Sequence, residues 1–462
     1  MAREVEGTEP SEPAPEGEIL PARTKAVYAL GDHTVNLALS SLSFFFPWFL
    51  TDVAGLRPWL AGLVPLIGRA VDAFTDPAMG RISDRTRWRA GRRRPYLLIG
   101  MVPFGVAYAA LWLDVPLANQ GLAFGYYAVA YVLFSLSITV LSIPYLSLIP
   151  ELTTSYDERT SINGYRAVLA ILGTLLAVLT MRPLAQALGG GARGFAAVGV
   201  LYGVWLTLPW ILVHRVTFER PGFRRPARLS FLEGMGVLFR QRSYRSLTAL
   251  FLLGRIAIDL TTAMMLYYFT YWIGRPDDFE ITMGLFLVSV VLAMPLWMRA
   301  AGGTDKHRVF LAGAFSWVVA DVFLLAAQPD WPRLAIFVGA ALAGVGYAAA
   351  DMMPWSMLGE VVDEDELESG ERREGIYFGF FTFLRKLGGA AGVAIALLVL
   401  DAAGFQANRP QEAGTLWTIR LLTAGVPAVF VLLAAAAALG YPLTRARHAE
   451  IRAELVRRRG PA

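Results

Sequence analysis

The sequence contains no cysteine among its 462 residues. This absence excludes disulfides, thiolate metal ligands and thiol nucleophiles from any account of the protein. Histidine is rare, with 4 residues, and lysine is rarer still, with 3 residues against 39 arginines. Because a bias towards arginine can reflect base composition, we infer no partner from the basic balance of the chain. The positions of the few lysines are correspondingly informative.

Charged residues are also scarce, at 17% of the chain, whereas 55% of the residues are hydrophobic. This composition is typical of polytopic membrane proteins. The sequence contains twelve hydrophobic runs, each long enough to cross a hydrocarbon layer about 30 Å thick. These runs cover approximately residues 24–50, 56–80, 95–113, 121–149, 163–187, 194–213, 246–273, 281–300, 308–327, 332–358, 374–401 and 415–441. We therefore predict an all-α membrane protein with twelve transmembrane helices.

A long basic loop divides the predicted spans six and six, which is the layout of transporter folds built from repeated halves. The tail before the first span is rich in Glu and Pro and lacks a signal-peptide layout, so we expect a disordered tail without cleavage. We predict five segments: a tail (1–23), an N-terminal half (24–213), a central loop (214–245), a C-terminal half (246–441) and a basic tail (442–462).

Arginines gather in three segments, with seven in residues 81–94, eight in 215–245 and six after Leu443. Because Lys and Arg in short loops stay cytoplasmic, we predict an inner-membrane protein with both termini and the central loop in the cytoplasm. Nucleic acid or acidic lipid could also bind such runs. The topological role is the simpler explanation, and we expect no nucleic-acid partner.

Asp72 and Asp76 lie four residues apart inside the second predicted span. This spacing puts both carboxyl groups on one helix face, where they can share one ion. A charge at bilayer depth costs roughly 2.5–3.5 kcal/mol on insertion scales, so the pair needs a positive partner. One alternative is that Asp72 pairs with Arg69 or with another helix and only holds the bundle together. A bound cation is favoured, because two acids facing one arginine leave a surplus negative charge.

Three stretches, at residues 68–96, 143–166 and 360–389, resemble blocks of the glycoside-pentoside-hexuronide cation symporters, in the same order. This family belongs to the major facilitator superfamily and includes the melibiose permease. The resemblance spans nearly the whole chain. It implies the major facilitator fold, a protein that is usually monomeric, and symport of a small solute with a cation.

In that family two aspartates of the second helix bind the coupling cation, and they match Asp72 and Asp76. The resemblance places Thr139 as the hydroxyl that completes the site. Oxygen ligands of this kind suit Na⁺, Li⁺ or a proton. We expect this ion and no other metal or cofactor.

The resemblance also implies a solute site. Its matching positions are Asn36, Ser142, Leu146, Arg166, Asp351 and Lys386, of which only the Arg and the Lys are kept in kind. Loss of the family's acids and stacking Trp at the other positions argues against melibiose itself. Trp355 or Tyr145 can supply an apolar face for a sugar ring.

Several further charges lie in or beside the apolar runs. Lys386 is more than a turn inside its span, which favours a functional charge over a side chain that reaches the interface. For Asp32, a functional role and a local or helix-to-helix hydrogen bond remain equally open. Arg255 and Asp259, an i,i+4 pair, are expected mainly to neutralise each other.

Two clusters at the predicted cytoplasmic side are expected to act in gating, through ion pairs between the halves in the outward-facing state. One is Asp84 with Arg85, and the other is the acidic run 360–374 with its basic neighbours. The second cluster comprises Glu360, Asp363, Arg372 and Arg373. The alternative is a set of solvated loop charges that contribute little.

These observations favour a cation-coupled symporter of a sugar or glycoside over an enzyme. Residues 353–364 and 380–389 also resemble the animal sodium-coupled lysolipid transporters, so a lysolipid is the alternative solute. A different class is an intramembrane enzyme that acts on a lipid-linked substrate with Asp72 and Asp76 as acid and base. A sensor or scaffold without transport is a third class.

Overall fold

The computed structural model describes residues 19–88, 91–116, 119–153, 155–220, 241–371 and 373–459. Regular structure in these residues is helical, apart from one isolated bridge between Trp88 and Gly91. Eleven helical spans in the described part of the chain are long and apolar enough to cross a membrane. α2 (Pro58–Arg85) is a further 28-residue helix, made less apolar by its charged side chains. The prediction of an all-helical membrane protein is therefore confirmed.

The N-terminal half contains α1 to α8. Their bounds are α1 (Ala22–Trp48) with the π-helical η1 (Phe49–Val53), α2 (Pro58–Arg85), α3 (Arg94–Leu111), α4 (Gln120–Ser147), α5 (Ile149–Leu152), α6 (Tyr156–Ala187), α7 (Gly191–Thr207) and α8 (Pro209–Val216). The short α5 and α8 continue the helices before them, so this half supplies six long helical units.

The C-terminal half contains α10 to α17. Their bounds are α10 (Arg242–Tyr267) with η2 (Tyr268–Trp272), η3 (Pro276–Asp278), α11 (Phe279–Gly303), α12 (Lys306–Ala326), α13 (Arg333–Ser369), α14 (Glu374–Ala402), α15 (Ala413–Arg420) with η4 (Leu421–Gly425) and α16 (Val426–Leu439), and α17 (Arg445–Arg459). Six long units thus precede the terminal helix α17.

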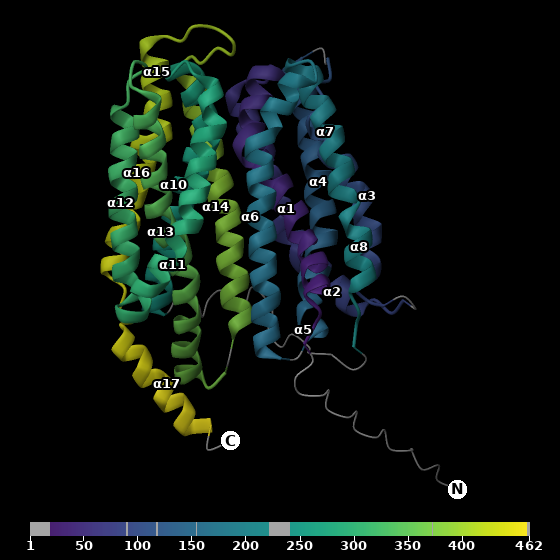
Figure 1. Ribbon diagram of the computed structural model, residues 1–462, viewed down its shortest axis with the longest axis vertical. Helices are drawn as coiled ribbons and strands as arrows, with labels where there is room; N and C mark the ends of the chain where they lie inside the picture. The colour runs from purple at the N-terminus through teal and green to yellow at the C-terminus, as the bar shows by residue number, and fades with distance from the viewer. Residues whose placement is uncertain are drawn as a thin grey trace.

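The two halves stand side by side with their helices along the long axis of the molecule (Figure 1). Within the N-terminal half, α1 packs along α6, and Gly173 allows this close approach. A Cβ atom added at Gly173 would lie 2.3 Å from the carbonyl oxygen of His33, which is backbone and cannot move aside easily. The halves meet mainly where α2 packs on α14, α1 on α10 and α6 on α11.

One predicted boundary is wrong. The tenth span was expected to end near residue 358, but α13 continues to Ser369 and ends at Gly370, which has a left-handed φ of 74°. Glu360 and Asp363 are therefore helical and do not belong to a loop. The proposed disordered tail 1–23 and central loop 214–245 fall largely on residues 1–18 and 221–240, outside the described residues, as do residues 460–462 of the basic tail.

Candidate functional site

Asp72 and Asp76 lie on one face of α2, as their helical spacing predicts, and this face is turned towards α4. The Asp72 side chain is only 1% exposed, and the hydroxyl of Ser135 donates a hydrogen bond to it. One turn further along α4, the hydroxyl of Thr139 donates to Asp76 over 2.7 Å. The structure thus brings together the three residues of the predicted cation site. Sequence reasoning missed Ser135, although it lies four residues before Thr139 and therefore on the same helix face.

Two positive side chains face this pair of acids. The Arg69 guanidinium lies 3.1 Å from Asp72. The Lys386 ammonium reaches across from α14 in the other half and lies 2.6 Å from Asp76 and 3.5 Å from Asp72. The structure therefore balances two negative charges with two positive ones. Lys386 contacts both acids, in the region where a shared ion would lie.

The expected surplus of negative charge is therefore wrong for this conformation, because Lys386 adds a second cation to the cluster. The sequence indicated that Lys386 was functional and placed it with the solute. The partners of Lys386 could not be predicted from the sequence pattern, since Asp76 lies 310 positions away in the sequence. The ion pair also joins α2 of one half to α14 of the other.

Asp32 has partners on two other helices, and a functional role for it stays a prediction. The Arg166 guanidinium of α6 forms a two-pronged contact with the Asp32 carboxylate, with N–O distances of 2.6 and 2.9 Å. The hydroxyl of Tyr145 in α4 lies 2.6 Å from the same carboxylate. Asn36 donates to the backbone carbonyl of Asp32 over 2.8 Å. Asn36, Tyr145 and Arg166, which were predicted to contact the solute, thus form one cluster around Asp32. Ser142, a further predicted solute residue, is half-buried in α4, three residues before Tyr145.

Tyr145 does not offer a face to a sugar ring, and that prediction is wrong. Its side chain is 1% exposed, because Tyr28 stacks on it at 4.4 Å between ring centroids and Trp210 packs edge-on at 5.4 Å. Trp355, the other candidate, is half-buried on α13 and packs edge-on against Phe251 and Phe381.

The C-terminal half holds a second group of charges, on α10, α13 and α14. Arg255 and Asp259 form the expected pair, with N–O distances of 2.5 and 3.0 Å. Asp351 lies close enough to Arg255 to interact electrostatically. Arg385, which sequence reasoning missed, interacts with Asp259 and Asp351. It adjoins Lys386, and its position in an apolar run could have identified it.

The gating role stays a prediction for the outward-facing state, and the pairs described for these residues here lie within one half. Asp84 pairs with Arg93 at 2.6 Å, within the N-terminal half. In the C-terminal half, the acids and Arg373 pair with neighbours of their own half: Glu360 with Lys306 (2.8 Å), Asp363 with His448 (3.0 Å) and Arg373 with Glu371 (3.2 Å). No partner is described for Arg85, and Arg372 lies outside the described residues.

Among the described residues, a set of hydrogen bonds between the halves lies at the end away from α17. At that end the Tyr271 hydroxyl donates to the carboxylate of Asp52, and the hydroxyls of Thr51 and Tyr267 lie 2.7 Å apart. The amide of Asn408 donates to the backbone carbonyl of Asp52 over 2.7 Å. Two ion pairs reinforce this closure: Arg182 with Glu280 at 2.7 Å and Arg57 with Asp401 at 2.7 Å. We call this set of contacts the closed end.

Loss of one hydroxyl at the closed end is expected to favour its opening. Tyr271→Phe removes a hydrogen bond to a carboxylate, which is worth about 1.5–3 kcal/mol, so the open-to-closed ratio should rise about tenfold or more. Because the chain has no cysteine, spin labels at Leu188→Cys and Asp330→Cys would report the distance between the halves at this end.

Tyr126→Phe is the matched control for this change. It removes a tyrosine hydroxyl that donates to the carbonyl of Ala110 within one half. We expect the label distances of this control to equal those of the parent protein. Equal distances in Tyr271→Phe as well would show that the Asp52 contact does not hold the closed end.

The fold and this site define a membrane carrier of two six-helix halves that meet at buried charges. The profile of the family described as "MFS/sugar transport protein" matches residues 27–445, so the chain belongs to this family of the major facilitator superfamily. An uncharacterized symporter of Synechocystis sp. is 32% identical, over 94% of this chain and 96% of that protein.

Two further relatives are also symporters, and the name of one of them states its solute. The inner membrane symporter YicJ of Escherichia coli is 29% identical over 92% of both chains. The sodium-dependent lysophosphatidylcholine symporter 1 of Gallus gallus is 27% identical, over 94% of this chain and 89% of that protein.

Solved structures agree on the fold. A bacterial homologue of the human lysosomal transporter Spinster, in an inward-facing and unoccupied conformation, superposes with a TM-score of 0.69. The superposition covers 94% of this chain and 97% of that one, at 12% sequence identity. At this identity the likeness concerns the architecture alone, and it supports the predicted major facilitator fold.

Proposed function

We propose that this protein is a cation-coupled symporter that carries a sugar or glycoside across the inner membrane by alternating access. The observation that carries the proposal is the cluster of Asp72, Asp76 and Thr139 between α2 and α4, contacted by Lys386 from the opposite half. Buried acids that face a bundle interior are typical of ion pathways in transporters.

In this proposal Lys386 and the coupling ion compete for the same two carboxylates. When Na⁺ or a proton binds Asp72 and Asp76, the Lys386 ammonium loses its partners and becomes available to a solute hydroxyl or carboxylate. The ion thereby raises the affinity for solute, and the solute raises the affinity for the ion by the same factor. When the ion leaves, Lys386 can return to the two carboxylates and join the halves through the contacts described above.

The solute would lie between the two charged clusters that flank this pair. One cluster is Asp32 with Arg166 and Asn36, and the other is Arg255 with Asp259 and its neighbours. Arg166 and Arg255 are each about one-fifth exposed, so they retain access to a bound molecule. Forked guanidinium groups suit vicinal hydroxyls or a carboxylate, as sugars and hexuronides present them.

A lysolipid is the second candidate solute. It is favoured by the resemblance to sodium-dependent lysophosphatidylcholine symporters over nearly the full chain. An enzymatic role for Asp72 and Asp76 is less well supported, because relatives and fold are those of transporters. Under the proposal the protein acts as a monomer in the bilayer, with the arginine-rich end and both termini in the cytoplasm.

A thermal-shift screen would separate the two solute classes. Purified protein would be heated with a panel of glycosides, hexuronides and lysophospholipids, each with and without Na⁺. A ligand at one hundred times its Kd stabilises the folded state by about 2.7 kcal/mol. We expect stabilisation by one or more of the sugars, larger in Na⁺ or at a pH that supplies the proton. Stabilisation by lysolipids alone would replace the sugar with the second candidate.

A further inference from the structure

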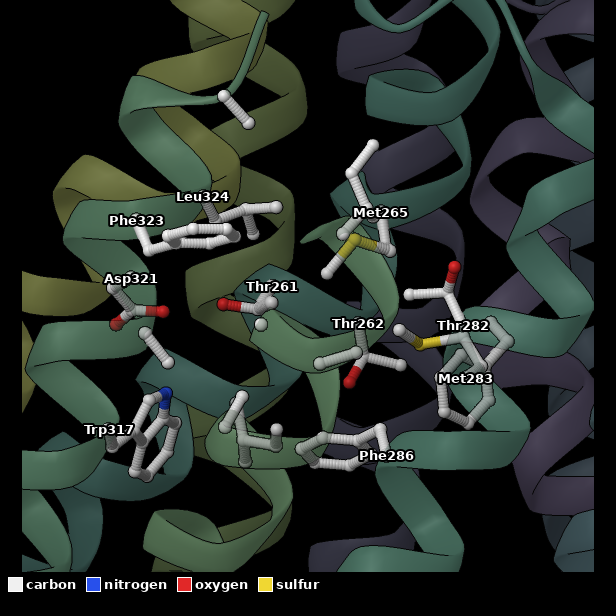
Figure 2. A pocket seen from close by; sticks show the side chains of 18 residues that line it. Thr261, Thr262, Met265, Thr282, Met283, Phe286, Trp317, Asp321, Phe323 and Leu324 are labelled. Carbon is white, nitrogen blue, oxygen red and sulfur yellow. The ribbon is translucent and has the colours of Figure 1, made fainter. Parts of the chain in front are cut away.

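A pocket inside the C-terminal half shares no residue with the clusters described above. Its walls come from α10, α11, α12 and α13, and Phe44 of α1 adds one side chain (Figure 2). The empty space is about 690 Å³, which includes space open to the surroundings. Within this outline, the centres of water-sized spheres can occupy about 50 Å³, so the pocket is narrow and suits a slender molecule.

The lining of this pocket is mostly apolar. Its main apolar side chains are Met265, Met283, Phe286, Phe323, Leu324 and Ile336. The hydroxyls of Thr261 and Thr282 donate to backbone carbonyls, at 3.0 and 2.6 Å, so their protons are already used. A sugar needs several polar partners and does not fit such walls. A hydrocarbon group does.

Asp321 of α12 is the exception in this lining. The residue is only 3% exposed, and its Oδ2 atom has no hydrogen-bond partner among the described residues. The indole of Trp317, one turn earlier on the same helix, is its hydrogen-bonding neighbour. Within the described ranges, no Lys, Arg or His forms an ion pair with it. A buried carboxylate without a positive partner is costly. The pocket thus has one buried carboxyl group that lacks a positive partner.

The arrangement of the lining side chains indicates how a ligand would be oriented in the pocket. Figure 2 shows Asp321 and Trp317 on one side of the space and Met283 and Phe286 on the other. A positive group at Asp321 would leave its attached hydrocarbon pointing towards the two methionines. Thioether side chains adapt to chains of different shape.

We propose that this pocket binds a hydrophobic amine, with the protonated nitrogen on the Asp321 carboxylate and the hydrocarbon group among Met265, Met283 and Phe286. The charge selects the ligand class. A fatty acid would place a second carboxyl group beside Asp321, and a neutral alcohol would supply no positive charge to pair with it. This site is additional to the symport proposed above and does not depend on it.

Octylamine, which is protonated at pH 7, is a suitable probe. Its binding to the protein in lipid nanodiscs would be measured by equilibrium dialysis, with empty nanodiscs as the reference for partition into lipid. Octan-1-ol and octanoate are the matched neutral and anionic ligands. We expect saturable binding of octylamine, at least tenfold tighter than binding of either comparison ligand.

Asp321→Asn keeps the size of the side chain and removes its charge, so octylamine should bind at least tenfold more weakly. Ala340→Phe is a second variant, which fills the pocket from α13 and leaves Asp321 unchanged. It should weaken octylamine binding as well. Equal affinity for octylamine and octan-1-ol in the parent protein would overturn the proposal, and so would undiminished octylamine binding by Asp321→Asn. If that variant does not fold, the ligand comparison and Ala340→Phe decide.

Discussion

Asp76→Asn is expected to abolish the cation-driven accumulation of solute in proteoliposomes, so that the ratio of inside to outside concentration falls to about one. Asp76 accepts hydrogen bonds from Thr139 and Lys386, and its side chain is 24% exposed, so an ion can reach it. The neutral amide keeps the size of the side chain but cannot hold a proton or balance a metal ion. Coupling energies between sites are typically 1–3 kcal/mol, or 5- to 150-fold in affinity, and this variant should lose that factor.

Solute exchange without a gradient separates loss of coupling from loss of folding. Asp76→Asn should still exchange labelled for unlabelled solute across the membrane, because the residues around Asp32 are unchanged. Asp330→Asn, which alters an exposed acid between α12 and α13, is the matched control and should accumulate solute normally. Normal accumulation by Asp76→Asn would exclude this residue from the cation site.

Lys386→Met is expected to have the opposite effect on cation affinity, with an increase of about tenfold or more. Without the ammonium, Asp72 and Asp76 face Arg69 alone, and one negative charge lacks a partner. A Na⁺ ion then binds without having to displace a tethered cation. A tenfold gain corresponds to about 1.4 kcal/mol, which is modest for removal of a competitor at 2.6 Å from a carboxylate.

The rise of the melting temperature with Na⁺ concentration measures this affinity. In Lys386→Met the half-maximal shift should occur at a tenfold lower Na⁺ concentration, and Na⁺ should no longer increase solute affinity. Lys386→Arg retains the charge and should stay closer to the parent protein. An unchanged or weakened Na⁺ response in Lys386→Met would contradict competition between the lysine and the ion.

The sequence predicted the parts of the site that depend on local spacing. The positions of Asp72 and Asp76 on one face of α2 follow from the helical repeat, and their distance from the helix ends marks them as buried charges. Membership of the transporter family was likewise visible in three stretches of residues, and the match over residues 27–445 confirms it. These features are encoded within one or two turns of helix or in continuous motifs.

Partners on different helices were not predictable in the same way. Arg166 reaches Asp32 across 134 positions, and Lys386 reaches Asp76 across 310. These pairs depend on how the helices cross, which hydropathy and periodicity do not specify. The burial of the Tyr145 ring was unpredictable for the same reason, because the residues that pack on it, Tyr28 and Trp210, belong to other helices, α1 and α8.

The boundary of α13 has a different cause. Hydropathy places the end of a span where the apolar run stops, but a helix can continue into polar residues whose charges find partners. Glu360 pairs with Lys306 and Asp363 with His448, beyond the apolar part of α13. Gly370 ends the helix, and this glycine was a usable signal, because helices commonly end with glycine in the left-handed conformation.

Uptake by the parent protein in proteoliposomes tests cation-coupled symport most directly. Vesicles would be loaded without solute and given an imposed inward gradient of Na⁺ or of protons, with the labelled solute identified by the thermal-shift screen. Cation coupling predicts that one of the two gradients drives the internal solute concentration transiently well above the external one, and that collapsing the gradient with an ionophore abolishes the excess. Uptake that only equilibrates under both gradients would contradict it.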